Sequence, residues 1–124
     1  MRWIVDGMNV IGSRPDGWWR DRHGAMAGLV ERLERWAAAE SVDVTVVFER
    51  PPSPPIESAA VTVAHAPEPA PNSADDEIIR IIAADPHPDQ IRVATSDRTL
   101  AERIRSVNAT VCPAERFRDL IDPR

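Results

Sequence analysis

The sequence contains no lysine, because all fifteen of its basic residues are arginine. This absence excludes every mechanism that needs a catalytic lysine. It also excludes the phosphate-binding loop that ends in Gly-Lys-Ser/Thr.

Cysteine, histidine and long apolar runs are also scarce. The single cysteine, Cys112, cannot form an internal disulfide, and its run Ala-Thr-Val-Cys favours a small core residue. His23, His65 and His87 are scattered, so no zinc pattern is present. No apolar run reaches the length of a membrane span, and the first residues lack a charged-then-apolar signal. We therefore expect a cytoplasmic protein with no membrane partner.

What remains is the composition of a soluble globular protein. The chain has 124 residues, of which 43% are hydrophobic and 28% charged, and its net charge is −5. This length is typical of one domain with a real core, so we expect a single domain over residues 1–124. The negative charge argues against a surface coated in basic residues for duplex binding. It does not exclude nucleic acid, because a cluster of metal-binding acids would itself lower the net charge.

Apolar runs of strand length alternate with helical periodicity along the chain. The predicted strands are residues 2–5, 42–49, 58–66, 90–95 and 109–112, with 58–66 at a sheet edge. The predicted helices cover residues 20–40, a segment starting near Ala74 with Ser73 as N-cap, residues 98–107, and a segment that Pro113 opens. This alternation predicts an α/β fold of three α/β/α layers around a mainly parallel sheet.

Several acids follow the predicted strands directly. Asp6, Glu49 and Asp97 each come at the end of a strand, and Asp75 and Asp76 begin a helix. The carboxyl ends of parallel strands meet at one edge of a sheet, where ligands bind. Carboxylates that converge repel one another, and Mg²⁺ or Mn²⁺ relieves that repulsion. The pattern therefore predicts an acidic metal site, with Asn9 as a neutral oxygen donor and Gly7 as clearance for the backbone.

Each acid also has an ordinary structural explanation when taken alone. Asp6 could be a turn residue, Asp97 could cap the helix after it, and Asp75 and Asp76 could simply favour a helix dipole. Two other α/β classes also place aspartates after strands. Haloacid-dehalogenase-like phosphatases have a second aspartate where Met8 stands here, and they and response-regulator receivers normally use a lysine. The missing lysine argues against both classes.

Three motifs resemble those of the NYN domain family, in its YacP-like branch of the PIN-like nuclease superfamily. They are "VDGMNVIG" near the N-terminus, "SADDEIIRI" in the middle and "VATSDRTL" in the third position. The resemblance implies a PIN-like three-layer fold and a Mg²⁺- or Mn²⁺-dependent ribonuclease leaving 5′-phosphate and 3′-hydroxyl ends. The resemblance covers nearly the whole chain. No single motif is decisive, but the three occur in the family's order and spacing, which is fairly specific.

The resemblance also assigns roles to residues. Asp6, Asp75 and Asp97 match the acidic, metal-binding core, while Asn9 matches the amide of the first motif and Asp76 an adjacent acid of the second. There are two departures from the family's pattern: Glu49 stands where an aspartate is common, and Thr99 stands near the place of a further acid. The expected activity is endonucleolytic hydrolysis of RNA. A non-catalytic RNA-binding or protein-interaction module on the same fold is the alternative.

The segment after the first motif contains the side chains expected to bind RNA. Arg14, Arg20 and Arg22 can contact phosphates, and Trp18 and Trp19 can stack on unpaired bases. Equally, one tryptophan could belong to the core while the other covers an apolar patch. Arg98, next to a strand-end acid, can bind phosphate or pair with that acid. The expected partner is single-stranded RNA, with a homodimer as one open oligomeric state.

Overall fold

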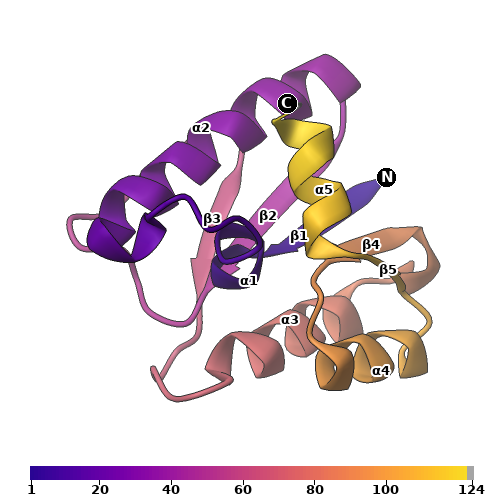
Figure 1. Cartoon of the computed structure of the whole chain (residues 1–124). Helices are drawn as coiled ribbons and strands as arrows, with labels where there is room; N and C mark the ends of the chain where they lie inside the picture. The colour runs from indigo at the N-terminus through magenta and orange to yellow at the C-terminus, as the bar shows by residue number, and fades with distance from the viewer. Residues whose placement is uncertain (123–124) are drawn as a thin grey trace.

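Residues 1–122, the part of the chain that this computed structural model describes, form a parallel five-stranded sheet (Figure 1). The strand order is β3-β2-β1-β4-β5, and every neighbouring pair is parallel. The strands are β1 (Arg2–Asp6), β2 (Asp43–Phe48), β3 (Thr62–His65), β4 (Ile91–Ala94) and β5 (Thr110–Cys112). All five carboxyl ends therefore point to the same edge.

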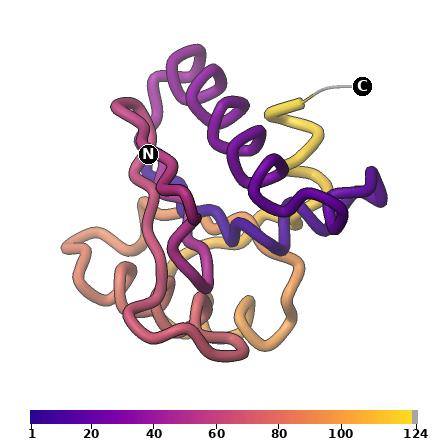
Figure 2. Tube along the Cα trace, turned by 90° about the vertical axis from the view of Figure 1, so that its left-hand side faces the viewer, coloured from indigo at the N-terminus to yellow at the C-terminus, as the bar shows by residue number. Residues whose placement is uncertain are grey.

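Helices cover both faces of the sheet, which gives three layers (Figures 1 and 2). On one face lie α1 (Gly7–Ile11), α2 (Arg22–Glu40) and α5 (Ala114–Ile121); on the other lie α3 (Ser73–Ala84) and α4 (Arg98–Ser106). Two short 3₁₀ helices, Trp18–Arg20 and Pro88–Gln90, precede α2 and β4. The predicted α/β/α fold with a parallel sheet is confirmed.

Side chains on the two faces of the sheet pack into two separate hydrophobic cores. In β1, Trp3 and Val5 pack towards α1, α2 and α5, whereas Ile4 between them packs towards α3 and α4. This is the two-residue alternation of a strand, and both sides are apolar because both faces are covered. The buried strands therefore read as nearly continuous apolar runs in the sequence.

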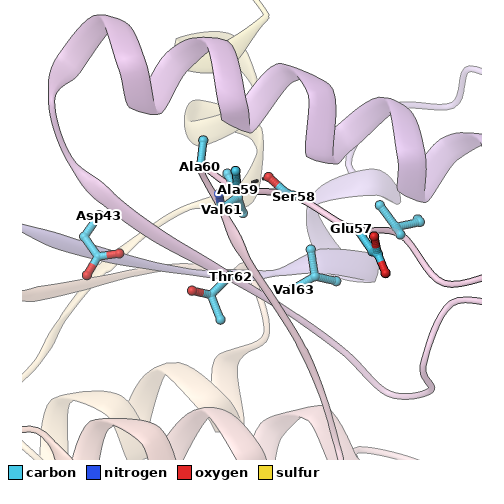
Figure 3. Close-up of a pocket in the computed structure, with 9 residues that line it drawn as sticks. Asp43, Glu57, Ser58, Ala59, Ala60, Val61, Thr62 and Val63 are labelled. Atoms are coloured by element: carbon cyan, nitrogen blue, oxygen red, sulfur yellow. Dashed lines mark hydrogen bonds between the residues drawn. The ribbon is translucent and has the colours of Figure 1, made fainter.

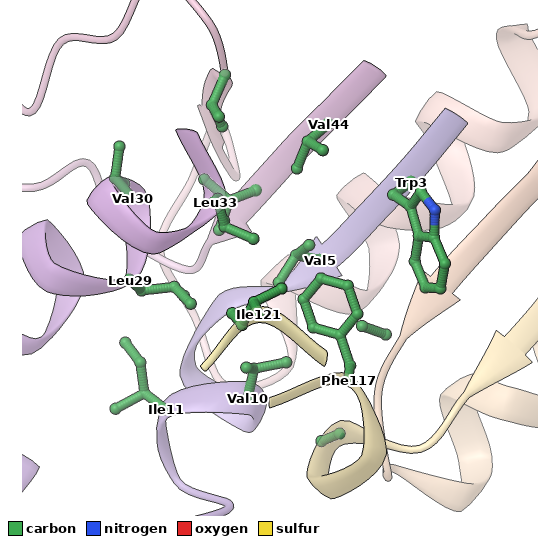
Figure 4. Close-up of a cluster of buried hydrophobic side chains, with 14 of the residues drawn as sticks. Trp3, Val5, Val10, Ile11, Leu29, Val30, Leu33, Val44, Phe117 and Ile121 are labelled. Carbon is green, nitrogen blue, oxygen red and sulfur yellow. The ribbon is translucent and has the colours of Figure 1, made fainter. Parts of the chain in front are cut away.

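Aromatic rings fill the larger core, part of which is shown in Figure 4. Phe117 lies with its ring centroid 5.1 Å from that of Trp3 and 5.3 Å from that of Trp36. Trp3 and Trp36 meet edge to face at 5.3 Å. Such pairs contribute about 0.5–1.5 kcal/mol beyond the area they bury. They join β1, α2 and α5, so the helix after β5 is fixed against the first strand.

Two local predictions are wrong. The strand predicted at 58–66 is only Thr62–His65, because Ser58 Oγ accepts from the Val61 N–H at 3.0 Å and turns the chain before it. Asn72, not Ser73, precedes α3: Asn72 has a φ of 63°, and Ser73 is the first helical residue. Ser73 Oγ instead accepts a bond from the Ala70 N–H at 3.2 Å. β3 does lie at the sheet edge, as predicted.

None of the helices in the described part of the chain is long and apolar enough to cross a membrane.

Candidate active site

Four acids gather at the carboxyl edge of the sheet. Asp6 ends β1, Glu49 directly follows β2, Asp97 precedes α4, and Asp75 lies in the first turn of α3. Burial, and to a lesser extent the negative charges of the other three acids, raise the pKa of Asp6 from an ordinary 3.8 to about 7. Only a bond from Thr95 acts in the opposite direction. The four acids are thus close enough to interact electrostatically.

Asp75 shows the same interaction from the other side. Burial raises the pKa of its carboxyl, and the charge of Asp97 raises it further; Arg103 lowers it, and Asp76 and Glu49 raise it. Both Asp6 and Asp75 therefore resist ionisation in the protein alone. A bound cation would reverse this, because it stabilises the charged carboxylates.

Thr95 connects Asp6 to Asp97. Its hydroxyl donates to Asp6 Oδ2 at 2.8 Å and accepts from the Asp97 N–H at 3.1 Å. Thr95 is itself buried, so this hydrogen bond is shielded from water. The bond orients one oxygen of Asp6, so that the other oxygen, Oδ1, remains for a ligand.

Asp97 caps α4 and also lies within electrostatic reach of two other acids. Its Oδ1 accepts from the Leu100 N–H at 2.9 Å, which caps α4. Its charge also raises the pKa of Asp6 and Asp75. Capping fixes the carboxylate in place, so a single residue both starts the helix and contributes to the acidic cluster.

Asn9 holds the loop after β4. Its Oδ1 accepts from the Ser96 N–H at 2.8 Å, and Ser96 Oγ in turn accepts from the Ala114 N–H at 2.9 Å. The amide oxygen predicted as a metal or water ligand therefore already has a protein partner. Its clearest role is to position the residue beside Asp97.

Gly7 allows α1 to begin immediately after β1. A Cβ at this position would lie 2.5 Å from Phe48 Cε1 and 3.1 Å from the Val47 carbonyl oxygen. Since Phe48 is buried, its ring has little room to move. The glycine brings the chain after Asp6 close over the end of β2, and this confirms the predicted clearance.

Asp76 is exposed in the first turn of α3, next to Asp75. It pairs with Arg103 at 3.0 Å, and 78% of its side chain is exposed. Arg103 also lowers the pKa of Asp75, so its guanidinium interacts with both neighbouring aspartates. Thr99 is exposed on the first turn of α4.

The residues predicted to bind RNA are placed differently from one another. Arg14 does not lie free at the site: it pairs with Asp119 at 2.7 Å and Asp122 at 3.0 Å, which ties its loop to α5. Trp18 is half-buried against the larger core, whereas 52% of Trp19 is exposed. The two rings meet edge to face at 5.9 Å. One tryptophan is thus largely structural and one is accessible.

The other predicted arginines are exposed. The guanidinium of Arg20 lies 5.9 Å from the Trp19 ring centroid, and that of Arg22 lies 5.4 Å from the Trp18 ring centroid. Arg98 is exposed at the start of α4, next to Asp97. These three arginines can therefore contact an anionic ligand, whereas the guanidinium of Arg14 is already paired with two aspartates.

The donor set suits a hard divalent cation, although the acids do not close around one. Within residues 1–122, no group of three or more His, Cys, Asp or Glu side chains is close enough to hold a metal ion unaided. Mg²⁺ commonly keeps several waters and binds through only one or two carboxylates. Asp6, Asp75 and Asp97 offer oxygen ligands of that kind, and burial together with the neighbouring acids raises the pKa of Asp6.

Two hollows differ in their relation to the acids. One of about 500 Å³ is lined by Asp43 and residues 56–63 (Figure 3). It lies where β2 and β3 begin, at the end of the sheet opposite to the acids. Another, of about 270 Å³, includes Glu49 and Met8 and adjoins the acidic edge.

Thr95 and Arg103 were not singled out from the sequence. A threonine directly after a buried strand and two residues before an acid is a weak signal for such a buried bond. Arg103 gave no signal, because its contact with Asp76 spans two helices that are separate in the chain.

Comparison with known proteins agrees with this geometry. A family model described as the YacP-like NYN domain matches residues 3–123. The crystal structure of Rae1 (YacP) from Bacillus subtilis is similar, with a TM-score of 0.79 and 25% identity over 97% of this chain and 73% of that chain. A tryptophan-to-leucine mutant of that protein gives a TM-score of 0.77 and 27% identity over 97% and 74%. No curated protein is similar enough in sequence to count as a match.

Proposed function

Because the chain belongs to the YacP-like NYN domain family, a PIN-like nuclease family, we propose that it is a Mg²⁺- or Mn²⁺-dependent endoribonuclease acting on single-stranded RNA. The observation that supports this most directly is the buried carboxyl of Asp6. Its pKa is about 7, and the neighbouring charges of Asp75, Asp97 and Glu49 contribute to that raised value. Such an arrangement is costly unless it serves a ligand.

Asp6, Asp75 and Asp97 would hold the metal. A bound Mg²⁺ or Mn²⁺ supplies Lewis acidity and a water with a lowered pKa, which suit hydrolysis of a phosphodiester. In the reaction, water adds to phosphorus and the bond to the 3′ oxygen breaks, which leaves a 5′-phosphate and a 3′-hydroxyl. The chain's own part is to keep the carboxylates in place.

Hydrogen bonds from neighbouring residues perform that positioning. Thr95 orients Asp6, the Leu100 N–H fixes Asp97, and Asn9 secures Ser96 in the same loop. Preorganised groups of this kind cost little reorganisation when charge develops in a reaction. Asp76 would act only at the rim, because its carboxylate already pairs with Arg103.

Substrate binding would use the exposed cations and the exposed ring. Arg20, Arg22 and Arg98 can each contact a phosphate, and Trp19 can stack on an unpaired base. Arg14 is not part of this proposal, since its guanidinium is committed to α5.

The test is cleavage of an end-labelled single-stranded RNA in Mn²⁺ by the wild type, Asp97→Asn and Asp89→Asn. Asparagine also caps helices well, so Asp97→Asn should keep α4 intact while removing the charge. Asp89 is exposed in the turn before β4 and serves as the matched control. We expect at least a hundredfold loss for Asp97→Asn and none for Asp89→Asn, in line with losses of such electrostatic groups.

A second candidate function is RNA binding without catalysis, and the open spacing of the acids in the described residues 1–122 is the observation that favours it. In that case the wild type and Asp97→Asn would bind RNA equally well, and neither would cleave it in Mg²⁺ or Mn²⁺. That result would overturn the proposed ribonuclease.

A further inference from the structure

A hollow of about 270 Å³ lies beside the acidic edge, between the start of α2 and the proline-rich loop after β2. Its apolar lining includes Met8, Met26 and Phe48, and its charged lining includes Arg22 and Arg50. Glu49 also lines it, and the charge of Glu49 raises the pKa of both Asp6 and Asp75. The hollow therefore shares Glu49 with the acidic edge.

A single hydrogen bond fixes one wall of this hollow. His23 Nε2 lies 2.8 Å from the carbonyl oxygen of Pro54. Since a carbonyl oxygen only accepts, the ring nitrogen donates. The bond attaches residues 51–54 to α2, so the hollow is built into the fold.

Its size and lining suit one flat, partly apolar group next to an anion. The volume is just below the roughly 300 Å³ at which pockets for drug-sized ligands begin, so it suits one base better than a larger ligand. Methionine adapts its shape and packs well against aromatic faces. Arg22 and Arg50 are both exposed and add positive charge at the mouth, as a neighbouring phosphate would require.

We propose that this hollow binds one unpaired base of the RNA, with Met8 and Met26 against the face of the base and Arg22 and Arg50 on the flanking phosphates. The inference rests on the proposed ribonuclease function and makes it more specific. A base inside a duplex is stacked on both sides and cannot enter such a hollow. The substrate would then be single-stranded at the base next to the cleaved bond.

The chain's three methionines provide a test that needs no substitution. Met8 and Met26 line the hollow, whereas Met1 is 61% exposed outside it. Mild peroxide oxidation followed by mass spectrometry measures each methionine separately, with EDTA present so that RNA is not cut. We expect single-stranded RNA to slow oxidation of Met8 and Met26 but not of Met1. An oligonucleotide lacking bases should protect none of the three.

Binding measurements on variants give a second readout. Single-stranded RNA should bind the wild type on the order of tenfold more tightly than the abasic oligonucleotide. Met26→Ala should bring the two affinities together, while Met26→Leu retains the apolar surface and should preserve the difference. Arg50→Ala should lower the slope of log K against log salt by about 0.7 for one lost phosphate contact. Arg105→Ala, an exposed arginine on α4, is its matched control.

Equal protection by intact and abasic strands would overturn the base-binding inference, as would protection of Met8 and Met26 by an apolar peptide but not by RNA. Cleavage in Mn²⁺ without methionine protection would refute base binding in the hollow but would still support the proposed nuclease activity. Protection in EDTA, together with no cleavage in a separate Mn²⁺ assay, would refute the proposed nuclease but leave base binding in the hollow supported.

Discussion

The hydroxyl of Thr95 donates a hydrogen bond to Asp6 Oδ2 at 2.8 Å, inside the sheet edge and away from water. This bond is the one influence that lowers the pKa of Asp6 against burial and three neighbouring acids. It therefore favours the charged form of Asp6, the form that binds a cation.

Replacing Thr95 by valine should raise the pKa of Asp6 further and weaken metal binding. The shape of the side chain is kept, but Asp6 loses a donor and the Asp97 N–H loses an acceptor. At pH 8 the free energy of unfolding should fall by about 1–3 kcal/mol, measured by urea denaturation. Thr95→Ser keeps the hydroxyl and should lose much less. Equal stability of the two variants would contradict the role given to this bond.

Stability should fall as the pH rises through the range set by Asp6. The unfolded carboxyl releases its proton near pH 3.8, but the folded one keeps it until about pH 7. Between these values the unfolded state is favoured progressively, by up to about 4 kcal/mol, and above pH 7 the effect is complete. Asp75, whose pKa is also raised, acts in the same direction. Denaturation of the metal-free protein at several pH values measures this.

Asp6→Asn is the control for that pH dependence. The variant removes the titrating group but keeps an oxygen that can accept from Thr95, so its stability should change much less between pH 5 and 7. Glu77 and Asp85, whose pKa values are lowered, affect stability only below about pH 5. Mn²⁺ should raise the melting temperature of the wild type more at pH 8 than at pH 5. An equal rise in Asp6→Asn would place the metal elsewhere.

Gly7→Ala should destabilise the protein by roughly 1–3 kcal/mol, because its Cβ would overlap the buried Phe48 ring. Gly28→Ala is a matched control inside α2, where the new Cβ meets only the flexible end of Arg32. That change should stabilise by about 0.5–1 kcal/mol through helix propensity. Phe48→Leu should partly rescue Gly7→Ala in thermal melts. If rescue is absent, the close approach of ring and glycine is not the cause.

Arg14→Ala should lower stability without changing RNA affinity. Its guanidinium joins the loop before α2 to Asp119 and Asp122. Arg22→Ala, in contrast, should weaken RNA binding and reduce its salt dependence with little effect on the melting temperature. Fluorescence anisotropy at several salt concentrations distinguishes the two variants. An equal loss of RNA affinity in both variants would show that Arg14 also belongs to the RNA-binding surface.

The sequence predicted the sheet and its acidic edge well, for a physical reason. A parallel strand covered on both faces has to be apolar on both faces, so a charge directly after it marks the carboxyl end. Asp6, Glu49 and Asp97 could be assigned to one edge without knowing the order of the strands.

Other features depend on contacts that no local pattern carries. The partners of Arg14 lie more than a hundred residues further along, so its exposure could not be judged from "SRPDGWWRDR". The helix Gly7–Ile11 has only five residues, too few for a periodic signal. Asn72 and Ser73 are both common N-cap residues, and the sequence alone does not show that the helical backbone begins at Ser73.

The Ser96 N–H donates a hydrogen bond to Asn9 Oδ1, and Ser96 Oγ accepts one from the Ala114 N–H. The loop that leads to Asp97 is therefore held at once by α1, through Asn9, and by the first residue of α5, Ala114. A nascent chain that has not yet produced α5 has its acids but not the full set of bonds that aligns them. The acidic edge therefore reaches its final geometry only when Ala114 has docked against Ser96.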